Sequence, residues 1–195
     1  MNQSVDIKVV PFSVIGGKLK TYAPGGYIPS KAWGRGMDLD GEVARIIKQS
    51  IGLAPGYGYT EQLYTISPPG QKNFDVSVVY YYLVAYKHIH NADAWTESVN
   101  TPDRSIIAYA KQRLRWKIEY TNVAYSLLPD EFVFGELQQV YEAILGRPMD
   151  KRNFRKKIFS LHILADTGKK RILGRARPAE VYRFKERKPT IVEIL

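Results

Sequence analysis

The chain has 195 residues, of which 45% are hydrophobic and 12% aromatic, and its 29 Lys and Arg against 19 Asp and Glu give a formal net charge of +10. It contains no cysteine, which excludes disulfides, thiolate catalysis and cysteine-ligated zinc. No apolar run approaches the ~18 residues of a membrane-spanning helix, and the first residues lack the basic and apolar regions of a signal peptide, so we expect a cytoplasmic protein without a membrane partner.

The first hundred residues show patterns typical of a mixed α+β fold. Segments rich in Val, Ile and Tyr predict strands, and apolar residues at helical spacing predict one short helix. The tyrosines at positions 80 to 82 are interpreted as sheet packing, with a surface for stacking nucleic-acid bases as the alternative. The expected elements are strands at residues 5–15, 18–22, 61–66 and 74–86, a turn at Gly16 and Gly17, a loop over residues 23–36 and a helix over residues 41–51.

The character of the chain changes at Asp103, where Thr101-Pro102-Asp103 is typical of a helix start. An apolar stripe then continues to Ile118, which predicts a long helix that links two domains. Beyond Pro129 we expect two more helices and a final pair of strands at residues 171–173 and 180–185.

The two helices within residues 134–158 have the pattern of a helix-turn-helix. In the first helix, apolar residues from Leu137 to Leu145 recur at i, i+3, i+4, i+7 and i+8, which predicts one buried face. Gly146 suits the left-handed end of that helix, and Asp150 suits the N-cap of the next. In the second helix, Phe154, Ile158 and Leu161 are expected to point inward.

Cations crowd the start of the second helix, where they oppose the helix macrodipole and so favour a polyanionic partner. Arg can bind guanine and Asn can bind adenine in the major groove of DNA, whereas Lys more often holds phosphate. The alternative is a basic helix that faces only solvent. The expected contacts are Lys151 and Asn153 in the first turn and Arg152, Arg155 and Lys156 on one outward face.

Residues 166–184 are typical of a hairpin with a tip rich in Gly and Arg, as in the wing of a winged helix. Arg175 and Arg177 flank a small residue and are expected to reach phosphates or a minor groove, although an ordinary flexible hairpin is the alternative. The distribution of charge also favours a nucleic-acid partner for the C-terminal half: residues 1–100 have a net charge of +1, whereas residues 101–195 have a net charge of +9. A polyanion would therefore meet the C-terminal half.

Five segments resemble the Nudix-related transcriptional regulators, which include the repressors of NAD biosynthesis. The resemblance implies an N-terminal Nudix-like α/β/α sandwich and a C-terminal winged helix-turn-helix domain. It places an effector-sensing domain at residues 1–102, a linking helix at 103–119 and a DNA-binding domain at 120–195. The segments that carry it are Glu61–Ile66, Leu127–Phe132, Glu136–Gly146, Asp150–Ile158 and Arg177–Phe184.

An active Nudix box reads G-x5-E-x7-R-E-U-x-E-E-x-G-U, where U is aliphatic, and its glutamates bind the Mg²⁺ that activates water. In the best match here the arginine and the second glycine are present as Arg45 and Gly52. The three downstream glutamate positions hold Ile46, Gln49 and Ser50. We therefore expect no catalytic residues, no metal site, no cofactor and no enzyme activity.

The resemblance implies that the inactive Nudix domain senses ADP-ribose or another NAD-related or sugar compound. Trp33 could stack on a base or a sugar and Arg35 could meet a phosphate, whereas a packed aromatic and a surface arginine are the simpler alternatives.

Three functions are weighed. The leading hypothesis is a homodimeric repressor that binds a double-stranded DNA operator and responds to a small-molecule effector. The second is a divergent Nudix hydrolase of nucleoside diphosphate derivatives that uses Asp38, Asp40 or Glu42. The third is a scaffold that binds DNA or a protein without any ligand.

Overall fold

The computed structural model describes residues 4–34, 36–54, 56–67, 76–97, 101–172 and 177–194. The chain forms two compact units. One comprises Met1–Ser13, Lys20–Val84 and His88–Lys111, and the other comprises Val14–Leu19, Ala85–Lys87 and Gln112–Leu195. No helix within the described residues is both long and apolar enough to cross a membrane.

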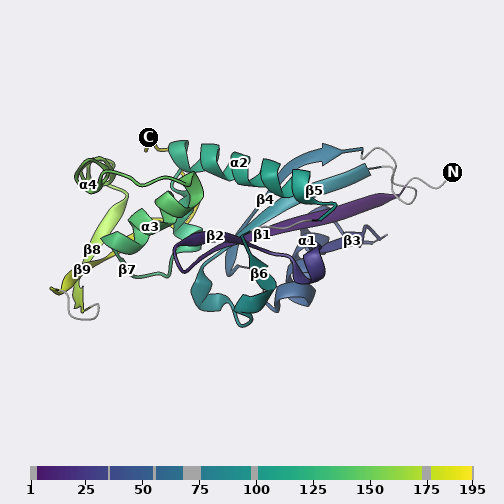
Figure 1. Cartoon of the computed structure of the whole chain (residues 1–195), viewed down its shortest axis with the longest axis horizontal. Helices are drawn as coiled ribbons and strands as arrows, with labels where there is room; N and C mark the ends of the chain where they lie inside the picture. Colours follow the sequence, from purple (N-terminus) through teal and green to yellow (C-terminus); the bar gives the residue numbers. More distant parts are fainter. Residues whose placement is uncertain are drawn as a thin grey trace. The chain divides into compact units, whose positions relative to one another are not determined.

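The first unit is built on a mixed sheet with the strand order β4-β5-β1-β2-β6, and β3 pairs with β1. The central strand β1 runs parallel to β5, with Val9 opposite Tyr80, and its side chains are buried on both faces. Helix α1 covers one face of the sheet and the start of α2 covers the other (Figure 1). The bounds are β1 Val5–Ile15, β2 Lys18–Tyr22, β3 Ser30–Ala32, α1 Leu39–Ile51, β4 Gly58–Ile66, β5 Val76–Val84, β6 Trp95–Thr96 and α2 Arg104–Tyr120.

The predicted short helix is confirmed as α1, which begins two residues earlier than expected. The side chain of Asp38 caps it by accepting a hydrogen bond of 2.7 Å from the backbone N–H of Gly41. Val43, Ile46 and Ile47 form its buried face. Gly52 ends the helix with a φ of 80°, a left-handed conformation that favours glycine.

A buried ion pair ties β1 to the start of α2. Lys8 Nζ lies 2.7 Å from Asp103 Oδ1 and 3.8 Å from Asp6 Oδ2, and all three residues are buried. Burial raises the pKa of Asp6, and the nearby charge of Asp103 raises that pKa further while Lys8 lowers it. The cluster therefore holds two carboxylates on a single buried cation.

The second unit contains the remainder of α2, two shorter helices and a three-stranded sheet with the order β7-β9-β8 (Figure 1). Both helices of the predicted helix-turn-helix are confirmed, and a two-stranded wing follows them. The bounds are β7 Phe132–Val133, α3 Phe134–Leu145, α4 Lys151–Ser160, β8 Leu164–Arg171 and β9 Ala179–Phe184.

The turn between α3 and α4 forms as the sequence predicts. Gly146 takes a φ of 71° at the end of α3, and Asp150 accepts a hydrogen bond of 2.7 Å from the backbone N–H of Asn153 at the start of α4. The ring of Phe154 lies 5.6 Å from that of Phe134 and 5.0 Å from that of Tyr141. These contacts fix α4 against α3.

The first wing strand was predicted at residues 171–173, which is wrong, because β8 occupies Leu164–Arg171. The chain reverses at His162, which has a φ of 53°, so Leu164 already pairs with Phe184. The register of β8 against β9 then shifts at an irregularity between Asp166, which pairs with Tyr182, and Lys170, which pairs with Glu180. Leu161 is only half-buried, because it lies at the end of α4 rather than on its inner face.

The predicted loop over residues 23–36 also differs from the structure, because it contains the short strand β3. This strand pairs with the N-terminal part of β1, with Lys31 opposite Ile7. Its three residues have too few apolar side chains to give a strand pattern, and it forms because β1 offers an unpaired edge.

We expect Lys8→Met to lower the free energy of unfolding at pH 7 by ~3–5 kcal/mol, the usual cost of breaking a buried ion pair. The substitution leaves Asp6 and Asp103 buried without a cation. When the pKa of a carboxyl is higher in the folded than in the unfolded state, the free energy of unfolding falls as the pH rises from the unfolded pKa to the folded pKa. The difference in the free energy of unfolding between Lys8→Met and the unsubstituted protein should therefore shrink as the pH is lowered from 7 to 4. Urea denaturation at pH 7 and pH 4 measures both effects. Lys48 is at an exposed position, so an equal loss of stability in Lys48→Met would contradict the assignment of the loss to the buried ion pair.

Candidate functional site

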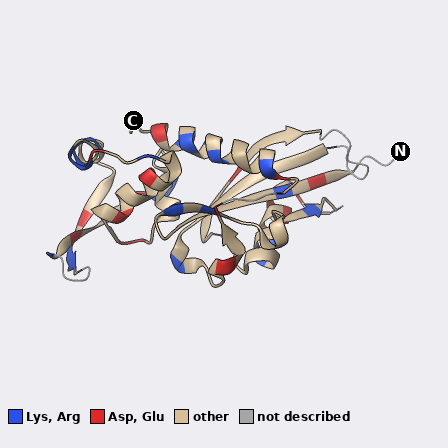
Figure 2. Cartoon of the chain, viewed as in Figure 1, with Lys and Arg blue, Asp and Glu red and all other residues tan. Residues whose placement is uncertain are grey.

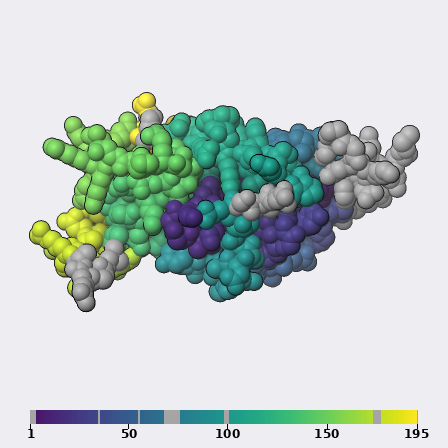
Figure 3. Space-filling model, in the orientation of Figure 1, coloured from purple at the N-terminus to yellow at the C-terminus, as the bar shows by residue number. Residues whose placement is uncertain are grey.

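Helix α4 presents cations that have no ion-pair partner within the described part of the chain: Lys151, Arg152 and Lys156 are all exposed. Asn153 is exposed beside them. Basic residues cover α4 in Figure 2, and long side chains project from the green segment that includes this helix in Figure 3. The first turn of α4 contains no acidic residue, so the positive end of the helix dipole adds to these charges.

Arg155 differs from its neighbours on the predicted outward face, because its half-exposed side chain contacts other parts of the unit. Its Nη2 donates to the hydroxyl of Tyr182 at 3.2 Å and lies 3.5 Å from Glu180 Oε2. Its guanidinium carbon lies 5.0 Å from the ring centre of Phe134 and 4.8 Å from that of Phe159. Arg155 therefore joins α4 to α3 and to the wing strand β9.

Part of the positive charge of the wing is neutralised inside the unit. Lys169 Nζ lies 2.7 Å from a carboxylate oxygen of Glu131, and Arg171 pairs with Glu136 at 3.1 Å. Arg177 is exposed immediately before β9. Arg175, the other predicted wing contact, lies outside the described residues.

In the first unit, the degenerate Nudix box does not offer the ligands of a divalent cation. Glu42 is a buried carboxylate of α1, and it pairs with Lys31 at 3.1 Å and with Arg45 at 3.4 Å. Ile46 is 3% exposed, so its position faces the core. No cluster of three His, Cys, Asp or Glu residues that could hold a metal occurs among the described residues. These residues therefore do not fit the Mg²⁺ of an active box.

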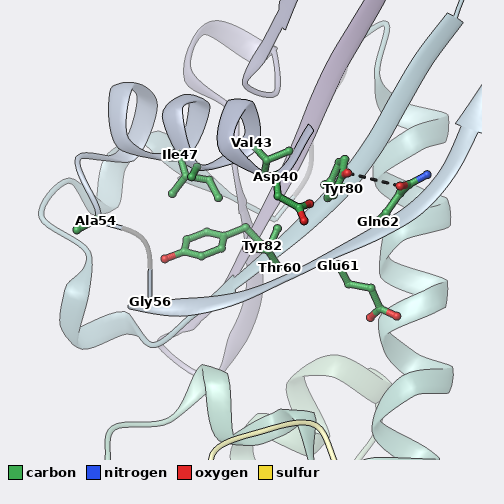
Figure 4. Close-up of a pocket in the computed structure, with 11 residues that line it drawn as sticks. Asp40, Val43, Ile47, Ala54, Gly56, Thr60, Glu61, Gln62, Tyr80 and Tyr82 are labelled. Carbon is green, nitrogen blue, oxygen red and sulfur yellow. Dashed lines mark hydrogen bonds between the residues drawn. The ribbon is translucent and has the colours of Figure 1, made fainter. Parts of the chain in front are cut away.

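A cavity of about 360 Å³ lies between α1 and the strands β4 and β5 (Figure 4). Helix α1 contributes Asp40, Val43 and Ile47, and the sheet contributes Thr60, Tyr80 and Tyr82. Because strand residues alternate between faces, Tyr80 and Tyr82 share the face that α1 covers, opposite Gln62 and Thr60 of β4. The cavity thus has one apolar wall and one polar wall.

The polar groups of this cavity differ in their hydrogen bonds. The hydroxyl of Tyr80 lies 3.4 Å from Gln62 Oε1, and burial, the charge of Asp40 and a hydrogen bond with the Asp40 carboxylate raise the pKa of Tyr80. The hydroxyl of Tyr82 is buried and makes no hydrogen bond with any described residue. Burial raises the pKa of Tyr82 to about 12, so this group stays a neutral hydroxyl.

The effector contacts expected from the sequence do not line this cavity within the described residues. The indole N–H of Trp33 donates to the carbonyl oxygen of Met37 at 2.8 Å, and its ring is exposed. Arg35 lies outside the described residues. The tyrosines at positions 80 to 82 were interpreted as sheet packing, with a base-stacking surface as the alternative, and the spacing of Tyr80 and Tyr82 on one strand face was the available signal for this cavity.

Comparisons with known proteins agree with this geometry. Residues 124–184 match the family described as the NrtR DNA-binding winged helix domain. The ADPR responsive transcriptional repressor NtrR of Acinetobacter baylyi is 29% identical over 141 residues, which cover 65% of this chain and 56% of that protein. The matched region thus spans little more than half the length of that relative.

Solved structures extend the likeness to both units. NrtR of Shewanella oneidensis in complex with a 27mer DNA is 26% identical, covers 93% of both chains and has a TM-score of 0.79. A MutT/nudix family protein of Enterococcus faecalis, 18% identical, covers 95% of this chain and 87% of its own with a TM-score of 0.69, which supports the fold alone.

The predicted fold class, a Nudix-like α/β/α sandwich with a winged helix-turn-helix, is thereby confirmed. The resemblance to the Nudix-related transcriptional regulators is confirmed as well: the chain joins a domain of Nudix fold to a winged helix of the NrtR DNA-binding family.

Proposed function

We propose that this protein is a transcriptional repressor that binds double-stranded DNA through its winged helix and senses a small metabolite through its Nudix-like unit. The observation that carries the proposal is the set of exposed cations at the start of α4, which have no internal partner among the described residues. Support comes from the relative named as an ADPR-responsive repressor and from the similar structure solved with DNA.

In this proposal, residues 1–102 sense the effector, residues 103–119 form the linking helix and residues 120–195 bind the operator. The protein acts as a homodimer in the cytoplasm. A 27mer, the DNA in the similar structure, has room for two half-sites one helical turn apart, as a two-fold symmetric dimer requires. The effector is ADP-ribose or a related NAD or sugar metabolite, and it acts by binding the DNA-competent and DNA-free states with different affinities.

The contacts are assigned by their chemistry. The start of a recognition helix usually meets the base edges of the major groove, so Arg152 and Asn153 are proposed to contact bases. Lys151 and Lys156 are proposed to contact phosphates, and Arg177 and Arg175 are proposed to contact DNA from the wing. Arg155 is proposed to position α4 relative to β9 rather than to contact DNA directly.

A divergent hydrolase is the less favoured alternative. Asp38 caps α1 and Glu42 pairs with two cations, so two of the three acids considered for catalysis are already engaged. Of these three acids only Asp40 lines the cavity, and the other carboxylate of the lining, Glu61, accepts hydrogen bonds from Tyr59 and Tyr81.

Removing a phosphate contact should change the salt dependence of DNA binding. We expect Lys156→Ala to weaken binding to all DNA sequences and to make the slope of log affinity against log salt shallower by ~0.9. Arg152→Ala should instead cost ~1–3 kcal/mol at the operator and relax its sequence preference. Fluorescence anisotropy with labelled duplexes at several salt concentrations measures both. Lys48→Ala, on α1, is the control, and identical behaviour of all three variants would contradict these assignments.

Arg155→Lys keeps the charge but loses the planar group that donates to Tyr182 and lies against the rings. We expect weaker operator binding with an unchanged salt slope, because no phosphate contact is removed. The same titration measures this. A slope reduced as in Lys156→Ala would show that Arg155 contacts phosphate.

We expect no turnover of ADP-ribose in the presence of Mg²⁺ or Mn²⁺, because the box lacks its metal ligands. Chromatography of the reaction products measures the release of AMP. Metal-dependent turnover that Asp40→Asn abolishes would favour the hydrolase instead.

A further inference from the structure

We infer that residues 190–194, the C-terminal segment, fix the start of helix α4 to the end of helix α2, and that Ile194 is the residue of this segment that positions α4. The inference rests on the proposed function, because α4 is the helix proposed to read DNA. All the residues that carry it belong to the second unit.

The C-terminal segment caps the end of α2. The last four carbonyl groups of an α-helix have no partner within the helix. Here the backbone N–H of Ile194 donates to the carbonyl oxygen of Glu119 at 2.8 Å, and that of Val192 donates to the carbonyl oxygen of Tyr120 at 2.9 Å. The segment therefore satisfies these carbonyls and runs beside the last turn of α2 (Figure 1).

Asn122 holds the other end of the segment. Its backbone N–H donates to the carbonyl oxygen of Thr190 at 3.2 Å, and its side-chain oxygen accepts a hydrogen bond of 2.8 Å from the backbone N–H of Thr190. Thr121 and Ile191 form an antiparallel bridge beside these contacts. Asn122 is 2% exposed, so little water competes for its hydrogen bonds. The path of the segment along α2 is thus fixed at both ends.

The side chain of Ile194 reaches the turn that precedes α4. It is 1% exposed, and it lines a cavity of about 240 Å³ together with Asp150, Asn153 and Phe154. Asp150 is the N-cap of α4, and Phe154 is the first buried residue of that helix. Among the described residues that line this cavity, Ile194 is the one from outside residues 147–157. The segment that is bonded to α2 therefore supplies an apolar side chain to the start of α4.

Ile191 separates this packing from the hydrogen bonds of the segment. Its side chain is 84% exposed, although its backbone takes part in the bridge with Thr121. Side chains three residues apart in an extended segment point to opposite faces, and the exposures of Ile191 and Ile194 agree with this. The two isoleucines are thus a matched pair, one against the turn and one in solvent.

A positioning role affects sequence recognition more than overall affinity for DNA. Bidentate contacts to base edges require a defined geometry, whereas a lysine can hold a phosphate as a point charge from several positions. A smaller side chain at position 194 would leave a space into which the first turn of α4, with Arg152 and Asn153, can shift. Its loss should therefore reduce the preference for the operator and leave the phosphate contacts in place.

The test is fluorescence anisotropy of the full chain with two duplexes of equal length. One is selected by the unsubstituted protein from a random library, and the other has the same bases in scrambled order. We expect Ile194→Ala to weaken binding to the selected duplex ~5-fold or more, comparable to the loss of one base contact. Binding to the scrambled duplex and the salt slope should not change. Ile194→Val should lie between Ile194→Ala and the unsubstituted protein, and Ile191→Ala, the control, should match the latter.

Hydrogen exchange of the protein without DNA tests the same packing independently. The backbone N–H groups of Asn153 and Phe154 both donate to Asp150 at the start of α4. We expect both amides to exchange faster in Ile194→Ala than in the unsubstituted protein, because the first turn opens more often, and at the unsubstituted rate in Ile191→Ala.

The inference is overturned if Ile194→Ala keeps the preference of the unsubstituted protein, if it weakens binding to both duplexes equally, or if Ile191→Ala has the same effect. Circular dichroism shows whether Ile194→Ala folds, and if it does not, the same comparison is made with Ile194→Val. An unsubstituted protein that selects no duplex would contradict the proposed repressor function. Hydrogen exchange then decides the inference by itself, and unchanged rates in both Ile194 variants would overturn it.

Discussion

The second unit depends on holding in place a helix whose exposed charges repel one another. Of the three exposed cations without ion-pair partners among the described residues, Lys151 and Arg152 lie in the first turn of α4, where the helix dipole disfavours them. The opposing contributions come from the other side of the helix: the Asp150 cap, the buried ring of Phe154 and the guanidinium of Arg155 against Phe134 and Phe159. The apolar face thus keeps an electrostatically unfavourable surface ready for a polyanion.

Much of this unit could be predicted from local sequence. Apolar spacing, Gly146 and Asp150 are short-range signals, and both helices form where they indicate. The position of Arg155 could not be predicted, because Glu180 and Tyr182 lie more than twenty residues further along the chain and reach it only through the sheet. The first wing strand was misplaced for a related reason: the turn at His162, which takes a positive φ that is uncommon for residues other than glycine, comes just before that strand begins.

The candidate ligand cavity shows a different limit. Strand alternation predicts that Tyr80 and Tyr82 share a face, but it does not predict where the helix above leaves space, since that depends on how α1 packs on the sheet. Trp33 was expected to stack on a base or a sugar, and in the structure its indole N–H donates to the carbonyl oxygen of Met37 in the loop that precedes α1.

The pairing of Glu42 with Lys31 and Arg45 has a consequence for the history of the fold. Restoring the box glutamates would not by itself restore a metal site, because a glutamate in place of Ile46 would enter the apolar core. Lys31, which pairs with Glu42, would still offer a cation to any carboxylate nearby. A complete Nudix box on α1 would thus require several coordinated substitutions, each unfavourable alone.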